Sequence, residues 1–202
     1  MTGTAATDDL AGRILSGLRA ANRGVGVILG LVLAATIIFV IADVVLRQMG
    51  NSLGGSDEIS GYSMAVLASW GLAVALMEGA HVRIDLLRQG LATRGRAAFD
   101  LTALTALTYV AVLVAWQAWP VLDKTLQRGS RANTPLATPL WIPQGLWFTG
   151  WVWFAICAVL MLIAAVLIAV QRDWARLDDA IGMGNEAEDA LAEARTLEES
   201  RK

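Results

Sequence analysis

The chain has 202 residues, of which 56% are hydrophobic and only 17% are charged, and its formal net charge is −2. Soluble domains usually carry about a quarter charged residues, so we do not expect a water-soluble globular fold. The near-neutral charge, without a basic cluster, also argues against a nucleic-acid partner. A single cysteine, Cys157, and a single histidine, His81, exclude an intrachain disulfide and a bis-histidine haem. We therefore predict no catalytic, cofactor-binding or metal-binding residues and no enzymatic activity.

The first 23 residues form a polar leader, and the uncharged stretch 24–42 follows them. This stretch is too long for the apolar region of a signal peptide, and no A-x-A cleavage site follows it. We expect a cytoplasmic leader at 1–23 and an uncleaved first span at about 24–46. Gly26 and Gly30 form a GxxxG pattern in this span. Because small residues let helix backbones approach closely in lipid, this pattern predicts a packing face.

Three further uncharged stretches, 59–77, 101–122 and 132–171, are each long enough to cross a hydrocarbon core of about 30 Å. Prolines at 135, 139 and 143 interrupt the last of them, so we expect its span to begin at the third proline. The sequence thus predicts an all-α integral membrane protein with four transmembrane helices. The last three should span about residues 59–78, 101–122 and 143–170. Residues 172–202 should form a polar, acidic cytoplasmic tail, as a solvated helix or a disordered segment rather than a docking element.

The distribution of basic residues predicts the orientation of the four spans. Nine arginines lie near the span ends on the side of the two termini, whereas four basic residues lie on the opposite side. Lys and Arg accumulate in cytoplasmic loops, so both termini should face the cytoplasm. Six of the eight tryptophans lie around the third loop, where they form an aromatic belt that contacts membrane lipid on the outer surface: Trp116, Trp119, Trp141, Trp147, Trp151 and Trp153.

Ionisable residues lie only near the predicted span ends. Asp43 and Arg47 are four residues apart in one helix, which favours a local ion pair. Arg47 and Glu58 flank a short loop between antiparallel spans, so we expect their side chains to meet across it and pin the hairpin. His81 and Asp85 share a helical face, but one imidazole and one exposed carboxylate are too few ligands for a metal site. A hydrogen-bonded turn at the cytoplasmic end of the second span is the favoured interpretation.

These short motifs, in their order along the four spans, resemble the small permease subunit of TRAP (tripartite ATP-independent periplasmic) transporters. The resemblance covers about residues 24–170. It rests on Arg47 and on four runs: Asn-Ser-Leu at 51–53, Asp-Glu-Ile-Ser at 57–60, His-Val-Arg-Ile-Asp-Leu-Leu at 81–87 and the proline-rich segment 134–143. Gln48 follows the arginine where the family commonly has an aromatic residue, which puts local contacts in question but not the membership.

The resemblance implies a non-catalytic, multi-pass subunit of the bacterial inner (cytoplasmic) membrane. Its partners would be a large multi-span permease and a periplasmic substrate-binding protein, and the pair of membrane subunits would take up an organic acid, a carboxylate, by symport. The large permease would use the sodium gradient, so this chain would need no cofactor of its own. Arg47, Glu58, His81 and Asp85 would then be fold or interface residues.

Two other functions fit four apolar spans. The first alternative is a membrane-anchor subunit of a redox or other enzyme complex, which would need cofactor ligands that the lone His81 does not supply. A small self-sufficient exporter would want a charged residue inside a span, and the four uncharged stretches contain none. The scaffold role implied by the resemblance is therefore the preferred hypothesis.

Overall fold

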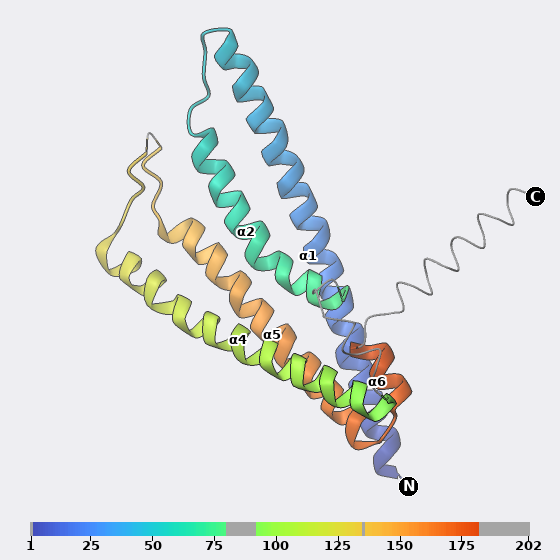
Figure 1. The fold of residues 1–202 in the computed structure, drawn as a ribbon. Helices are drawn as coiled ribbons and strands as arrows, with labels where there is room; N and C mark the ends of the chain where they lie inside the picture. The colour runs from blue at the N-terminus through green and yellow to red at the C-terminus, as the bar shows by residue number, and fades with distance from the viewer. Residues whose placement is uncertain (1, 80–91, 135, 182–202) are drawn as a thin grey trace, which may run out of the picture.

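The computed structural model describes residues 2–79, 92–134 and 136–181, and within that part of the chain the named secondary-structure elements are all helices. Four of the helices are long and apolar enough to cross a membrane, which confirms the predicted all-α membrane architecture. The helices, coloured along the chain in Figure 1, are α1 (Thr2–Gln48), α2 (Ser56–Met77), α4 (Thr93–Arg128), α5 (Trp141–Val170) and α6 (Trp174–Ile181).

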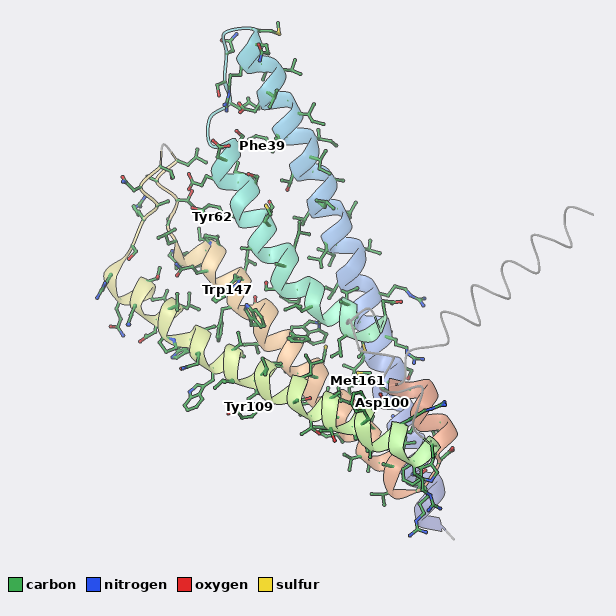
Figure 2. All side chains as sticks on the ribbon, viewed as in Figure 1. Phe39, Tyr62, Asp100, Tyr109, Trp147 and Met161 are labelled. Atoms are coloured by element: carbon green, nitrogen blue, oxygen red, sulfur yellow. The ribbon has the colours of Figure 1, made fainter. Side chains whose placement is uncertain are left out.

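The long helices form two antiparallel hairpins, α1–α2 and α4–α5, which lie side by side (Figure 1). Helix α5 is central, since it packs against α1, α2 and α4. Its apolar positions supply much of the core, and Cys157, Ala158, Ala164 and Ile168 are completely buried. Helix α4 is peripheral, and Tyr109 lies on its outer face with 68% of its surface exposed (Figure 2). The loops of both hairpins lie at one end of the bundle, which we call the loop end.

The segment read as a polar leader is part of the first helix. Helix α1 runs without interruption from Thr2 to Gln48, and its 47 residues correspond to about 70 Å at 1.5 Å per residue. It is therefore much longer than the hydrocarbon core. Its early turns pack into the bundle, where Ala11 and Leu18 are buried in the same cluster as Leu177 of α6. Helix α4, which contains Pro120, likewise continues beyond the predicted span end, to Arg128.

The start of the predicted tail is also structured. The sequence favoured a solvated helix or a disordered segment over a docking element after residue 171; in the structure α6 packs against both α4 and α5. In the sequence of this segment, Trp174, Leu177 and Ile181 form a short apolar stripe, and in the structure Leu177 is completely buried. The stripe covers only two turns, yet it is enough to hold an eight-residue helix against the bundle. The remaining tail residues lie outside the described part of the chain.

Helices α2 and α5 of the two hairpins approach each other closely at Gly150 of α5. A Cβ atom added there would lie 2.6 Å from Cδ1 of Trp70 and would also collide with the side chain of Ser69. Trp70 crosses from α2 and donates a hydrogen bond from Nε1 to the carbonyl oxygen of Leu146, at 2.9 Å. Only a residue without a side chain allows α2 and α5 to pack this closely.

The predicted GxxxG face of α1 packs less closely against α2 than Gly150 of α5 does. A Cβ on Gly26 would lie 3.7 Å from Cγ1 of Val74 on α2, which is an ordinary van der Waals distance. A Cβ on Gly30 would meet no atom within 4 Å. Within the described chain, Gly26 thus faces α2 while Gly30 faces outward, and the tight helix contact lies elsewhere.

Replacing Gly150 with alanine should destabilise the chain. The added methyl group must displace Ser69 and Trp70, and overpacking of this kind costs about 1–3 kcal/mol. Gly145 lies on the same helix with open space around its Cα, so Gly145→Ala is the matched control and should be neutral or slightly stabilising. Thermal unfolding of both variants in detergent measures the difference. Equal melting temperatures for the two variants would show that the α2–α5 contact is not tight.

Candidate functional site at the loop end

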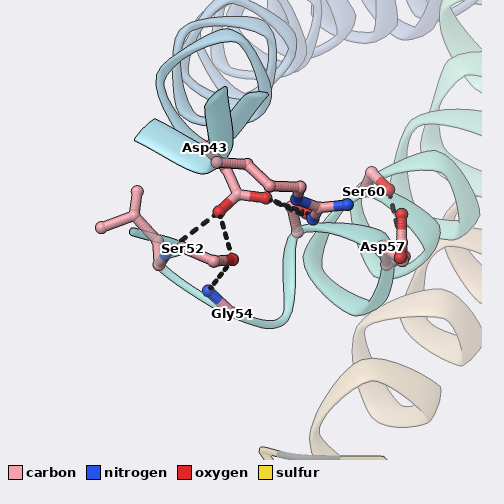
Figure 3. A network of polar contacts seen from close by, with 8 residues as sticks. Asp43, Ser52, Gly54, Asp57 and Ser60 are labelled. Carbon is pink, nitrogen blue, oxygen red and sulfur yellow. Dashed lines mark hydrogen bonds and ion pairs between the residues drawn. The ribbon is translucent and has the colours of Figure 1, made fainter. Parts of the chain in front are cut away.

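A buried carboxylate organises the loop that joins α1 to α2. The side chain of Asp43 is completely buried, and it accepts four hydrogen bonds (Figure 3). Arg47 Nη2 donates at 2.7 Å from one helical turn further along α1. The loop contributes Ser52 Oγ at 2.9 Å and the backbone N–H of Leu53 at 2.8 Å. Ser56 Oγ, at the first position of α2, donates at 2.7 Å.

The loop sequence allows the chain to fold around this carboxylate. Gly50, Gly54 and Gly55 all have positive φ angles, so the chain reverses direction within seven residues. The N–H of Gly54 donates to Ser52 Oγ at 3.1 Å, which orients the serine while its hydroxyl group donates to Asp43. The end of α1, the loop and the start of α2 therefore share a single acceptor.

A second carboxylate, Glu58, ties the two hairpins together. It accepts a hydrogen bond from Tyr62 OH at 2.7 Å within α2, and a short one from Thr134 Oγ1 in the loop between α4 and α5. Thr138 of the same loop donates through both its side chain and its backbone. Because Glu58 and Thr134 are 76 residues apart in sequence, this carboxylate connects segments that have no local reason to meet.

The loop between α4 and α5 has a regular shape that presents these threonines. Arg131 and Pro139 form an isolated antiparallel bridge, and the N–H of Ala132 donates to the carbonyl oxygen of Thr138 at 2.9 Å. At the tip, Leu136 lies directly over Gly55, where an added Cβ would come within 2.6 Å of its Cγ. The absent side chain at Gly55 therefore serves both the turn into α2 and the contact between the two loops.

The predicted ion pair between Asp43 and Arg47 is confirmed, whereas the predicted meeting of Arg47 with Glu58 is wrong. Arg47 bonds to Asp43 and, at 3.3 Å, to Ser56, while Glu58 bonds to Tyr62 and the threonines of the other loop. Sequence proximity suggested the pairing, but the loop brings closer partners to both side chains. His81 and Asp85 lie outside the described residues.

A polar cluster inside the bundle was not predicted from the sequence. Asn22 of α1 is 2% exposed; its Nδ2 donates to the carbonyl oxygen of Leu18 at 3.0 Å and to Cys157 Sγ at 3.4 Å. Trp153 Nε1 donates to Asn22 Oδ1 at 3.2 Å. The available signal was helical spacing, because Ala11, Leu18 and Asn22 fall on one face of α1. These bonds fix the rotation of α1 against α5.

The chemistry of the loop end is that of a structural lock. Its carboxylates accept hydrogen bonds from hydroxyl, guanidinium and backbone donors, an arrangement that satisfies buried charge. In the described ranges, no three His, Cys, Asp or Glu side chains gather closely enough to hold a metal ion. The geometry therefore points to a fixed connection between helices.

Comparison with known proteins decides the family. A family model for the DctQ component of tripartite ATP-independent periplasmic transporters matches residues 36–171, which is more than half of the chain. The chain belongs to the DctQ family. The resemblance seen in the sequence is thereby confirmed, and the chain is a small membrane subunit of a TRAP transporter. No curated protein and no solved structure matches the chain significantly.

Removing the Asp43 carboxylate should destabilise the hairpin of this DctQ chain. Asp43→Ala removes the acceptor that is shared by four hydrogen-bond donors, in Arg47, Ser52, Leu53 and Ser56. Two of these residues lie within the short loop and Ser56 directly follows it. We expect the melting temperature in detergent to fall by about 5 °C or more. Asp57→Ala removes an exposed carboxylate from the same helix start and should change the melting temperature little. Similar losses in both variants would contradict the lock.

Proposed function

We propose that this DctQ chain is a non-catalytic scaffold that holds a large permease in place, while the permease carries an organic acid with sodium. A periplasmic binding protein would deliver the substrate, and the inner membrane of a bacterium would be the site of transport. Both termini would face the cytoplasm, so that the loop end lies on the periplasmic side. The small chain would bind neither substrate nor sodium.

The observation that carries this proposal is that the apolar stretches of the four long helices contain no charged side chain. Residues 24–42, 59–77, 101–122 and 141–170 contain no Asp, Glu, Lys, Arg or His. Carrying an anion across lipid requires polar or cationic partners near the midplane, and sodium requires several oxygen ligands there. Several polar side chains inside the bundle bond to one another instead: Thr36 with Ser63 at 2.9 Å, and Asn22 with Trp153.

The packing of the helices and of the two loops also supports a rigid subunit. The loop end is held by Asp43 and Glu58, and α5 is fixed on α2 through Gly150 and Trp70. Alternating access in secondary transporters relies on broken helices or on repeats that rock against each other. Helix α5 is continuous for 30 residues, and the proline in α4 lies only eight residues before that helix ends. The moving parts are therefore assigned to the permease.

Reconstitution in proteoliposomes tests the proposal. Vesicles that contain the cognate permease and this chain, with the binding protein outside and an inward sodium gradient, should take up a radiolabelled carboxylic acid. The acid is one that raises the melting temperature of the binding protein in a thermal-shift screen. The purified small chain alone should give no uptake above empty vesicles, and the permease without it should lose most of its activity. The neutral amide of the same acid serves as the control substrate. Sodium-driven uptake by the small chain alone would overturn the scaffold role.

A further inference from the structure

The second hairpin carries an open apolar groove on its outer side. The groove lies between α4 and α5, has a volume of about 550 Å³ and is lined by aliphatic and aromatic side chains. Trp116 and Trp119 line it from α4, and Val152 and Ile156 line it from α5. The ring of Trp119 lies against that of Phe148 of α5, with 5.6 Å between the ring centroids. Because Trp116 is 73% exposed, the groove opens to the surroundings of the bundle.

Tyr109 continues the same face of α4 beyond the groove. It precedes Val112, which lines the groove, by three residues and Trp116 by seven, so helical spacing places the three side chains on one face. The residue is 68% exposed and lies on the outer face of the helix (Figure 2). The groove and this tyrosine therefore form one continuous surface.

The hydroxyl group of Tyr109 differs from those of the neighbouring threonines. Thr105 and Thr108 donate to the carbonyl oxygens of Leu101 and Leu104, one turn back along the helix, each at 2.7 Å. No hydrogen bond joins the Tyr109 hydroxyl to any part of the chain that the structure describes. The ring carries this hydroxyl away from the backbone, so its partner must come from outside the helix.

The depth of Tyr109 makes lipid a poor neighbour for this hydroxyl. The residue lies eight positions after the start of the uncharged stretch 101–122, which is about 12 Å along the helix, and close to the midpoint of α4. Hydrocarbon offers no hydrogen-bond partner at this depth, whereas a tyrosine of an aromatic belt keeps its hydroxyl among the headgroups. An aromatic belt in lipid therefore accounts for Trp116 and Trp119 but leaves the Tyr109 hydroxyl unsatisfied.

We propose that this groove, together with Tyr109, receives one membrane-spanning helix of the large permease. That helix would place aliphatic side chains in the groove and one polar group within reach of the Tyr109 hydroxyl. Close packing and interhelical hydrogen bonds join helices in lipid, where apolar surfaces gain nothing by leaving water. Aromatic side chains are also enriched at protein interfaces. The inference rests on the proposed partnership with a permease and assigns the docking surface to the second hairpin.

Replacing Tyr109 with phenylalanine tests the hydrogen bond while keeping the ring. Tyr109→Phe should raise the apparent Kd between the full chain and the cognate permease in detergent micelles by about 3- to 10-fold, because hydrogen bonds between membrane helices contribute on this scale. Fluorescence anisotropy of the labelled chain, titrated with permease, measures the Kd. The matched control is Thr105→Val, which removes an exposed hydroxyl of the same helix that is already bonded within the chain. This control should leave the Kd unchanged.

Filling the groove tests the packing surface. Val159 lines the groove from α5 and is 37% exposed, so Val159→Trp would occupy the space that the permease helix needs. The Kd should rise by about 10-fold or more, as expected for overpacking at a close contact. Ile38→Trp adds the same side chain at a site on α1 that is 68% exposed, and it should bind normally. Unchanged melting temperatures of the chain alone would show that the variants are folded.

The outcomes separate this docking surface from the proposed function. If the unmodified chain binds the permease and supports uptake, but Tyr109→Phe and Val159→Trp bind equally well, the groove faces lipid and the docking surface is wrong while the scaffold role stands. If the unmodified chain does not bind the permease, the proposed function fails too. An equal rise of the Kd in the two control variants would also contradict the site. Self-association of the chain alone that Val159→Trp abolishes would assign the groove to a second copy and overturn the inference.

Discussion

The buried carboxylate of Asp43 constrains the hairpin at the loop end of this chain. Burying the Asp43 carboxylate away from water costs free energy, and this cost is offset only if several hydrogen-bond donors converge on the carboxylate. The donors come from the end of α1, from the loop and from the start of α2, so the hairpin must close in one way to satisfy them. That closure places Glu58 and Gly55 where the second hairpin can reach them. The relation between the hairpins therefore follows from the geometry around one aspartate.

The two ends of the bundle are held by different physical means. At the loop end, charged and hydroxyl groups bond to one another and leave little freedom in either loop. At the opposite end, α6 attaches through apolar contacts, with Leu177 buried in the same cluster as Ala11 and Leu18 of α1. Between these ends, α5 packs against α1, α2 and α4, and Gly150 allows its close contact with α2. In our proposal, such a body supplies a fixed reference in the bilayer for a permease that moves.

The parts of the structure that depend on local relations could be predicted from the sequence. The uncharged stretches predicted the four long helices, and the spacing of Asp43 and Arg47 within one helix predicted their ion pair. The bond from Thr134 to Glu58 could not be predicted, since no pattern links positions 76 residues apart. The continuation of α1 through its charged turns was missed because hydropathy marks where a span leaves lipid, not where a helix ends. The two-turn stripe of α6 was too short to distinguish docking from solvation.

The central claim is that the locked loop end makes this subunit a rigid reference for a moving permease. Spin labels at Asn51 and Asn133, both exposed and one on each loop, allow the distance between the hairpins to be measured by pulsed electron resonance in the reconstituted transporter. The account predicts a single narrow distance distribution that is the same with and without a sodium gradient and loaded binding protein. A distribution that shifts or splits when transport begins would show that the hairpins move against each other, and it would contradict the account.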